Sequence, residues 1–123
     1  MIHVYNFRKR FEAPIVAGTK RQTIRAHRRD GRVPHPGDRL HGYVDLRSRR
    51  ARRIVASDVL SVHNIDVDWS GVSIAIDGKK LTVKETYALA IADGFKARDE
   101  MEHFFREQYG EKFSGILIKW RAP

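Results

Sequence analysis

The sequence predicts an α+β fold, in which a mixed β-barrel of five to six strands is flanked by two to three helices. Strand patterns dominate the middle of the chain, from residue 39 to residue 80. Helical patterns occur near the start and between residues 82 and 109. Strands and helices do not alternate regularly, which argues against a parallel doubly wound sheet. The 123 residues suit one domain that spans 1–123.

The first segments predict a strand, a short helix and a second strand. Residues 1–7 alternate in side-chain type, as a strand does. A short helix is expected to follow and to end near Ala17, because Gly18 sits where a helix often terminates and Pro14 is tolerated in a first turn. In the segment 21–26, alternate residues should share a face, which would place Thr23 beside Arg21 and Arg25.

The rest of the chain predicts a loop, several strands and two helices. The loop at 27–38 is rich in proline and glycine. "TVKE" at 82–85 has the form of a capping box and should begin a helix that closes at Gly94. The other expected elements are strands at 39–46, 54–69, 72–77 and 115–120, and a helix at 97–109.

The composition restricts the chemistry and points to an anionic partner. Cysteine is absent, which excludes disulfides, thiolate metal sites and cysteine nucleophiles. No apolar run approaches a membrane span and no signal peptide precedes the first charged residues, so we expect a soluble, cytoplasmic protein without membrane contact. Residues 1–53 hold 15 Lys/Arg against 4 Asp/Glu, whereas residues 54–123 hold 9 against 11. Such segregated positive charge favours a polyanion such as nucleic acid.

Three short motifs resemble those of a known family. The first is Gly-x-Lys-x-x-Thr-x-Arg, carried by "GTKRQTIR" at 18–25. The second is Pro-Gly-Asp at 36–38, and the third is Asp-Gly-Phe at 93–95, which stands between the two expected C-terminal helices. With the closing strand "GILIKW", these motifs are similar to those of the ASCH domain, a member of the PUA-like superfamily. The resemblance spans nearly the whole chain.

The resemblance implies a PUA-like pseudobarrel of five or six strands that binds RNA. One small subgroup of the family hydrolyses N(4)-acetylcytidine with a lysine, a threonine and a glutamate. Lys20 and Thr23 match the first two by position, and Asp93 stands nearest the third, with Glu85 as a second possibility. The chemistry is consistent, because a threonine hydroxyl needs a base, and a lysine near other cations can be that base.

Arginines are the candidate nucleic-acid ligands, because their guanidinium groups match phosphate in two-pronged fashion and stack on bases. Those near the motif are Arg25, Arg28, Arg29, Arg32, Arg47, Arg49, Arg50, Arg52 and Arg53. The candidate aromatics for base stacking are Tyr5, Phe7, Tyr43 and Trp69, although each is also a natural core residue. The six histidines show no metal-binding spacing, so neither a metal nor a cofactor is expected.

The sequence is consistent with four functions, which we rank in order. Binding of RNA, another nucleic acid or a nucleotide by a basic cleft ranks first. An amidohydrolase that deacylates N(4)-acetylcytidine-type nucleosides, with Lys20, Thr23 and Asp93 as catalytic candidates, ranks second. A ribonuclease ranks third, because metal-dependent cleavage needs clustered carboxylates that the basic half lacks. A protein-interaction module on the acidic helical half is the fourth. The alternative to all four is structural: Thr23 as an ordinary strand residue and the arginines as a solvated hairpin. Whether the protein is an enzyme, and its oligomeric state, stay open.

Overall fold

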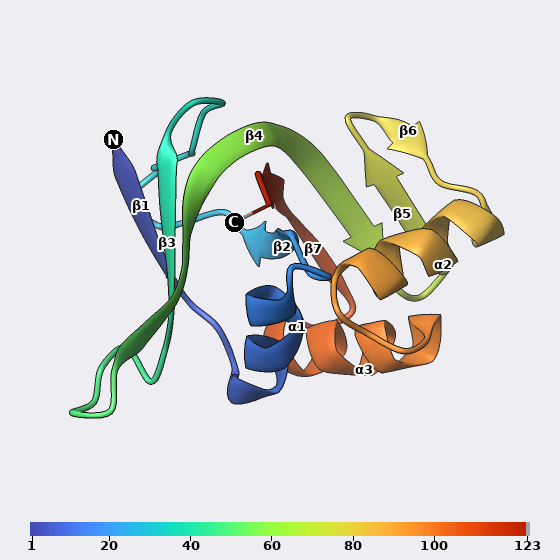
Figure 1. Ribbon diagram of the computed structural model, residues 1–123. Coiled ribbons are helices and arrows are strands. Elements are labelled where there is room, and N and C mark those ends of the chain that lie inside the picture. Colours follow the sequence, from blue (N-terminus) through green and yellow to red (C-terminus); the bar gives the residue numbers. More distant parts are fainter. Residues whose placement is uncertain (123) are drawn as a thin grey trace. The chain divides into compact units, whose positions relative to one another are not determined.

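The computed structural model describes residues 1–122 and has an α+β fold, as predicted. Over this range the chain forms one mixed seven-stranded sheet and three α-helices (Figure 1). The strand order is β1-β3-β4-β5-β6, and β2 pairs with β7, which also pairs with β4. The expected count of five to six strands is therefore too low. The order also has ends at β1 and β6, so these pairings do not close a barrel.

The elements follow the predicted order, with small shifts at their ends. The strands are β1 (Ile2–Asn6), β2 (Gln22–Ala26), β3 (Arg39–Val44), β4 (Arg52–Asp68), β5 (Ser73–Ile76), β6 (Lys79–Lys80) and β7 (Lys112–Trp120). The helices are α1 (Glu12–Ala17), α2 (Val83–Ala92) and α3 (Arg98–Tyr109), and a 3-10 turn, η1 (Lys9–Phe11), precedes α1. The pattern of the sequence did not predict β6, which has only two residues.

The chain divides into two compact units. Unit 1 consists of residues 1–22, 34–62 and 118–122, and unit 2 consists of residues 23–33 and 63–117. Strands β2, β4 and β7 each contribute residues to both units. That the whole chain acts as one domain stays a prediction.

In unit 1, β3 pairs in parallel with β1 and antiparallel with β4, and these strands lie side by side in Figure 1. Strand β1 buries His3 and Tyr5 and leaves its aliphatic residues Ile2 and Val4 exposed. Gly42 of β3 is required by packing. A Cβ there would lie 2.6 Å from Cγ1 of Val55 and 2.8 Å from Cε2 of Phe7.

Helix α1 ends as the sequence predicts. Gly18 has φ 81°, a left-handed conformation that glycine adopts without steric cost. The amide of Gly18 donates to Ile15, while the amides of Thr19 and Lys20 both donate to the carbonyl of Pro14. These bonds satisfy the last carbonyls of the helix and reverse the chain.

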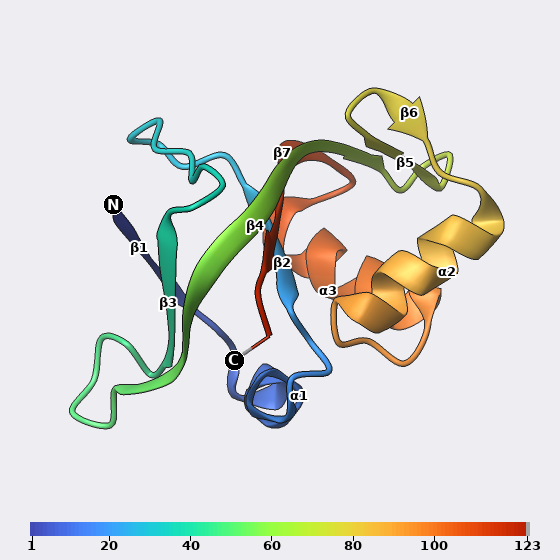
Figure 2. The ribbon, with the colours of Figure 1, turned by 45° about the horizontal axis from the view of Figure 1, so that its top comes forward.

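In unit 2, β5 pairs antiparallel with the end of β4, and β6 pairs with β5 (Figure 2). Thr82 caps α2, and the capping box with Glu85 is present in full, as predicted. Helix α3 packs its aromatic side against neighbouring rings: Phe105 lies 5.9 Å from Phe95 and 5.6 Å from Phe113, measured between ring centroids. These rings form an aromatic cluster against α3 in unit 2.

Candidate functional site

Lys20, the first catalytic candidate, lies in unit 1 directly after α1. Its side chain is only 2% exposed, and its Nζ lies 4.8 Å from the centroid of the Phe11 ring. The reversal at Gly18 and the bond from the Lys20 amide to Pro14 turn this residue back against the helix. An ammonium group over a ring face is attracted by the electron density of the ring, which partly replaces lost hydration.

Thr23, the second candidate, lies in the part of β2 that belongs to unit 2. It is 4% exposed, and its hydroxyl oxygen accepts a hydrogen bond of 3.0 Å from Nε of Arg25. The two side chains therefore share a face of β2, as predicted. Gly115 of β7 belongs to the same unit, and a Cβ on it would lie 2.0 Å from the carbonyl oxygen of Arg25. The backbone that carries this pair is thus closely packed.

Asp93, the third candidate, is the C-cap residue of α2 in unit 2 and is 2% exposed. Gly94 follows with φ 97°, and the amide of Phe95 donates to the carbonyl of Ala90. The Asp-Gly-Phe motif is thus the turn that ends α2. The alternative acid, Glu85, is exposed and bonds the amide of Thr82, so the structure gives that carboxylate a capping role.

All three catalytic candidates are buried, which is unusual for charged side chains such as those of Lys20 and Asp93. Lys20 belongs to unit 1, whereas Thr23 and Asp93 belong to unit 2. That the three side chains meet in one site therefore stays a prediction.

Asp38, the acid of the Pro-Gly-Asp motif, anchors a turn in unit 1. Its carboxylate accepts a bond of 2.9 Å from Nε2 of the buried His3 and one of 3.0 Å from the amide of His35. The His3 bond, followed by the His35 bond, holds the pKa of Asp38 below its usual value of 3.8. Because Gly37 has φ 91°, the motif forms a tight turn that ties the loop to β1.

The net positive charge of the chain is confined to unit 1. The 13 Lys/Arg residues of that unit face 4 Asp/Glu residues, whereas unit 2 holds 11 of each. Unit 2 is neutral rather than acidic, because it includes the cations of residues 23–33. The formal net charge of +9 thus equals the charge of unit 1.

Four exposed arginines gather where β3 turns into β4, and we call them the arginine cluster: Arg47, Arg49, Arg50 and Arg53. The β3–β4 loop, residues 45–51, projects beyond the ends of both strands in Figures 1 and 2. Within residues 1–122, none of the four arginines forms an ion pair with an acidic side chain. Their guanidinium groups are available to a ligand.

Backbone and side-chain bonds give the β3–β4 loop a defined shape. The amide of Ser48 donates to Asp45, and the amide of Ala51 donates to Ser48. The amide of Leu46 donates to Oδ1 of Asn6, which fastens the loop to the end of β1. The arginine cluster is therefore carried by an ordered turn.

Several other predicted arginine ligands are already paired. Arg52 forms a two-pronged ion pair with Glu12 of α1, and its hydrogen bond is the main cause that lowers the pKa of that carboxyl. Arg28 and Arg32 both lie near Asp30, at 3.3 and 3.9 Å. Arg25 bonds Thr23, whereas Arg29 is exposed without an ion pair in the described chain.

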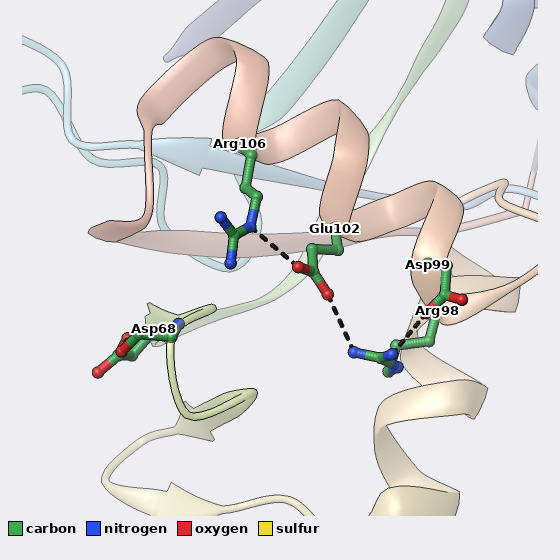
Figure 3. Close-up of polar contacts among 6 residues, drawn as sticks. Asp68, Arg98, Asp99, Glu102 and Arg106 are labelled. Atoms are coloured by element: carbon green, nitrogen blue, oxygen red, sulfur yellow. Dashed lines mark hydrogen bonds and ion pairs between the residues drawn. The ribbon is translucent and has the colours of Figure 1, made fainter.

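The cations of α3 in unit 2 are paired along their own helix. Glu102 lies between Arg98 and Arg106. It accepts a hydrogen bond of 3.0 Å from Arg98 and forms an ion pair of 2.9 Å with Arg106 (Figure 3). Intrahelical pairs at this spacing stabilise the helix modestly. These arginines therefore differ from the arginine cluster of unit 1, whose charge is not compensated.

Within residues 1–122, no group of three or more His, Asp or Glu side chains is arranged to hold a metal ion. Within the same described range, every helix is too short or too polar to cross a bilayer.

One aromatic candidate of the four stands apart. Tyr5, Phe7 and Trp69 are buried core residues, whereas Tyr43 is only partly buried. His41, two residues earlier in β3, was not among the predicted site residues. In the sequence, Arg39, His41 and Tyr43 alternate with apolar residues, and this alternation predicts that His41 lies on the same face of the strand as Tyr43.

No family model matches this chain, and neither a curated protein nor a solved structure matches it.

Proposed function

We propose that this chain is a PUA-like ASCH domain that binds RNA or a nucleotide, with the arginines of unit 1 as ligands of phosphate. The observation that carries the proposal is the confinement of the net positive charge to unit 1. Four acidic residues are too few to neutralise 13 cations within that unit. A surface of this kind attracts polyanions and releases their counterions on binding.

The arginine cluster supports the proposal at the level of individual groups. Its members are exposed and have no acidic partner in the described chain. Guanidinium groups donate paired hydrogen bonds that match the oxygens of phosphate. Arg52 is excluded from this set, because Glu12 occupies its guanidinium.

Binding of a single-stranded RNA of about 12 nucleotides, titrated at several salt concentrations, tests the proposal. Each phosphate contact contributes roughly 0.7 to the slope of log affinity against log salt for single strands. Replacing Arg49 and Arg50 with alanine should therefore make the slope shallower by about 1.4 and weaken binding on the order of tenfold.

Lys79 and Lys80 provide a matched control. They are also adjacent, exposed cations, but they lie in β6 of unit 2. Replacing both with alanine removes the same charge and should leave the slope nearly unchanged. Absence of RNA binding at low salt, or equal effects of the two double variants, would contradict the proposal.

A second candidate function is hydrolysis of N(4)-acetylcytidine-type nucleosides. It is favoured by the burial of Lys20, Thr23 and Asp93, because polar side chains kept from solvent are common in catalytic sites. In this function the Thr23 hydroxyl attacks the acyl carbon while Lys20, in its neutral form, accepts the hydroxyl proton. The C–N bond then breaks, Lys20 passes the proton to the leaving nitrogen of cytidine, and water hydrolyses the acyl-threonine to regenerate Thr23. Asp93 orients the lysine. Release of cytidine by the wild-type chain and its loss in Thr23→Ala test it. No turnover by the wild-type chain excludes it.

A further inference from the structure

In unit 1, the paired strands β1, β3 and β4 have an outer face to which the proposed function assigns no role. In β3, Leu40, Gly42 and Val44 are buried, whereas Arg39, His41 and Tyr43 alternate with them. The latter three side chains therefore point away from the core of unit 1. We call the surface around His41 and Tyr43 the outer face.

Tyr43 is the exception among the aromatic residues of unit 1. Tyr5, Phe7, Phe11 and Trp120 are all buried, as an aromatic core residue should be. Tyr43 is partly exposed, and its side chain forms no hydrogen bond or ring contact with the rest of residues 1–122. A large ring held on a strand without such contacts is available for stacking.

His41 lies two residues from Tyr43 on the same face, at a strand spacing of about 6.6 Å. Its neighbours across the sheet are small or aliphatic: Val4 of β1 and Ala56 of β4. Desolvation, followed by the charges of Arg53 and Arg39, lowers the pKa of His41 below 6.5. At neutral pH it is therefore an uncharged aromatic ring.

The outer face adjoins the arginine cluster. Arg53 is the cross-strand partner of Tyr43, and the β3–β4 loop begins two residues after Tyr43. An apolar and aromatic strip thus continues into exposed, uncompensated positive charge. Extended single-stranded nucleic acid has the matching chemistry, because its bases offer ring faces and its backbone offers phosphates.

We infer that His41 and Tyr43 form a stacking platform for the bases of single-stranded RNA, while the arginine cluster holds the adjoining phosphates. The inference rests on the proposed function and narrows it to unpaired RNA. Duplex RNA does not fit, because its bases are stacked inside the helix and leave only grooves and backbone exposed.

The experiment compares two probes of equal length: an oligouridylate of about 12 nucleotides and a ribose-phosphate oligomer without bases. A base that stacks on an aromatic ring adds affinity without involving charge. The wild-type chain should therefore bind the oligouridylate about tenfold or more tightly than the oligomer without bases. Tyr43→Ala should abolish most of this preference and leave affinity for the baseless oligomer unchanged. Tyr43→Phe should retain it, because the ring remains.

Two further variants keep the test decisive. Tyr43→Leu preserves an apolar side chain in case the alanine variant does not fold, and it should lose the preference as well. Tyr87→Ala removes an exposed tyrosine from α2 of unit 2 and should have no effect.

The outcomes separate this inference from the proposed function. The platform is overturned if the wild-type chain binds the two probes equally. It is also overturned if Tyr43→Leu keeps the full preference for the oligouridylate. RNA binding stands in both cases. Binding of neither probe at low salt overturns both. If the chain instead proves to be a dimer in solution, Val4→Asp tests whether the outer face is its interface. If Val4→Asp dissociates the dimer and leaves the preference for bases unchanged, a second copy covers the outer face. That result also overturns the platform.

Discussion

Replacing Gly115 with alanine tests how tightly β7 is packed against β2. An added Cβ would lie 2.0 Å from the carbonyl oxygen of Arg25, 2.8 Å from its carbonyl carbon and 2.9 Å from Cα of Ala26. All three are backbone atoms, so no side chain can rotate to make room. The strands must separate by about 1 Å before the contacts reach 3.0 Å, the shortest distance that real Cβ atoms show.

The cost follows from this displacement. Overpacking of a close-packed region costs about 1–3 kcal/mol, and weakened hydrogen bonds between the strands add to it. We take about 3 kcal/mol as the expected loss. Unfolding of a 123-residue chain has an entropy of about 0.26 kcal/mol per kelvin, so the melting temperature should fall by roughly 12 °C.

Thermal unfolding followed by circular dichroism measures the effect, and Gly71→Ala is the control. Gly71 lies in a turn of the same unit, and a Cβ on it meets nothing within 4 Å. If Gly115→Ala melts within about 2 °C of wild type, as Gly71→Ala should, the close approach of the two strands is refuted.

Three further predictions concern stability and binding. Thr82→Ala should lower the free energy of unfolding by about 1 kcal/mol in urea denaturation, whereas Thr82→Ser should retain most of it, because a hydroxyl still caps α2. The lowered pKa of Asp38 means that its bond with His3 stabilises the fold above pH 3.8 and is lost as the pH falls below that value. Asp38→Asn should flatten the dependence of stability on pH below 3.8, and an unchanged acid-unfolding curve would contradict this. If RNA binding is confirmed, Glu12→Gln should release Arg52 and steepen the salt slope by up to about 0.7; an unchanged slope would mean that Arg52 does not reach phosphate.

The sequence predicted those elements whose ends are set by local chemistry. The capping box at Thr82 and the glycine that ends α1 both appear where they were expected. Each depends on bonds between residues a few positions apart, so a short stretch of sequence is enough to specify it. The neighbouring strands at 54–69 and 72–77 were also predicted, and the structure pairs them as β4 and β5.

Features that depend on distant contacts were missed. Ile2 and Val4 alternate with His3 and Tyr5, and the pattern alone did not fix which set is buried. The structure buries His3, because Asp38, which is 35 residues away, accepts its hydrogen bond. Arg52 was predicted to bind nucleic acid, but Glu12, 40 residues away, pairs with it. Only the folded chain reveals such partners.

Some local features of the candidate residues were predicted, whereas their function stays a prediction. Burial of Lys20 and Thr23 is consistent with a role beyond that of a solvated turn, and the shared face of Thr23 and Arg25 is confirmed by their hydrogen bond. The arginines appeared in sequence as one undivided set. Their separation into paired and unpaired residues depends on which acids the fold brings near, which sequence order does not specify.

The bonds that shape the β3–β4 loop have an energetic consequence for any ligand of the arginine cluster. Ser48, Asp45 and Leu46 fix the backbone of the loop before a ligand arrives. Ordering a flexible backbone costs about 1–2 kcal/mol for each residue, and here that cost is met during folding. Only the rotamers of the long arginine side chains must be restricted on binding, at about 0.5–1.5 kcal/mol each. The loop should therefore capture phosphate as a preorganised receptor, so that loosening it by Ser48→Gly weakens affinity even though every arginine is retained.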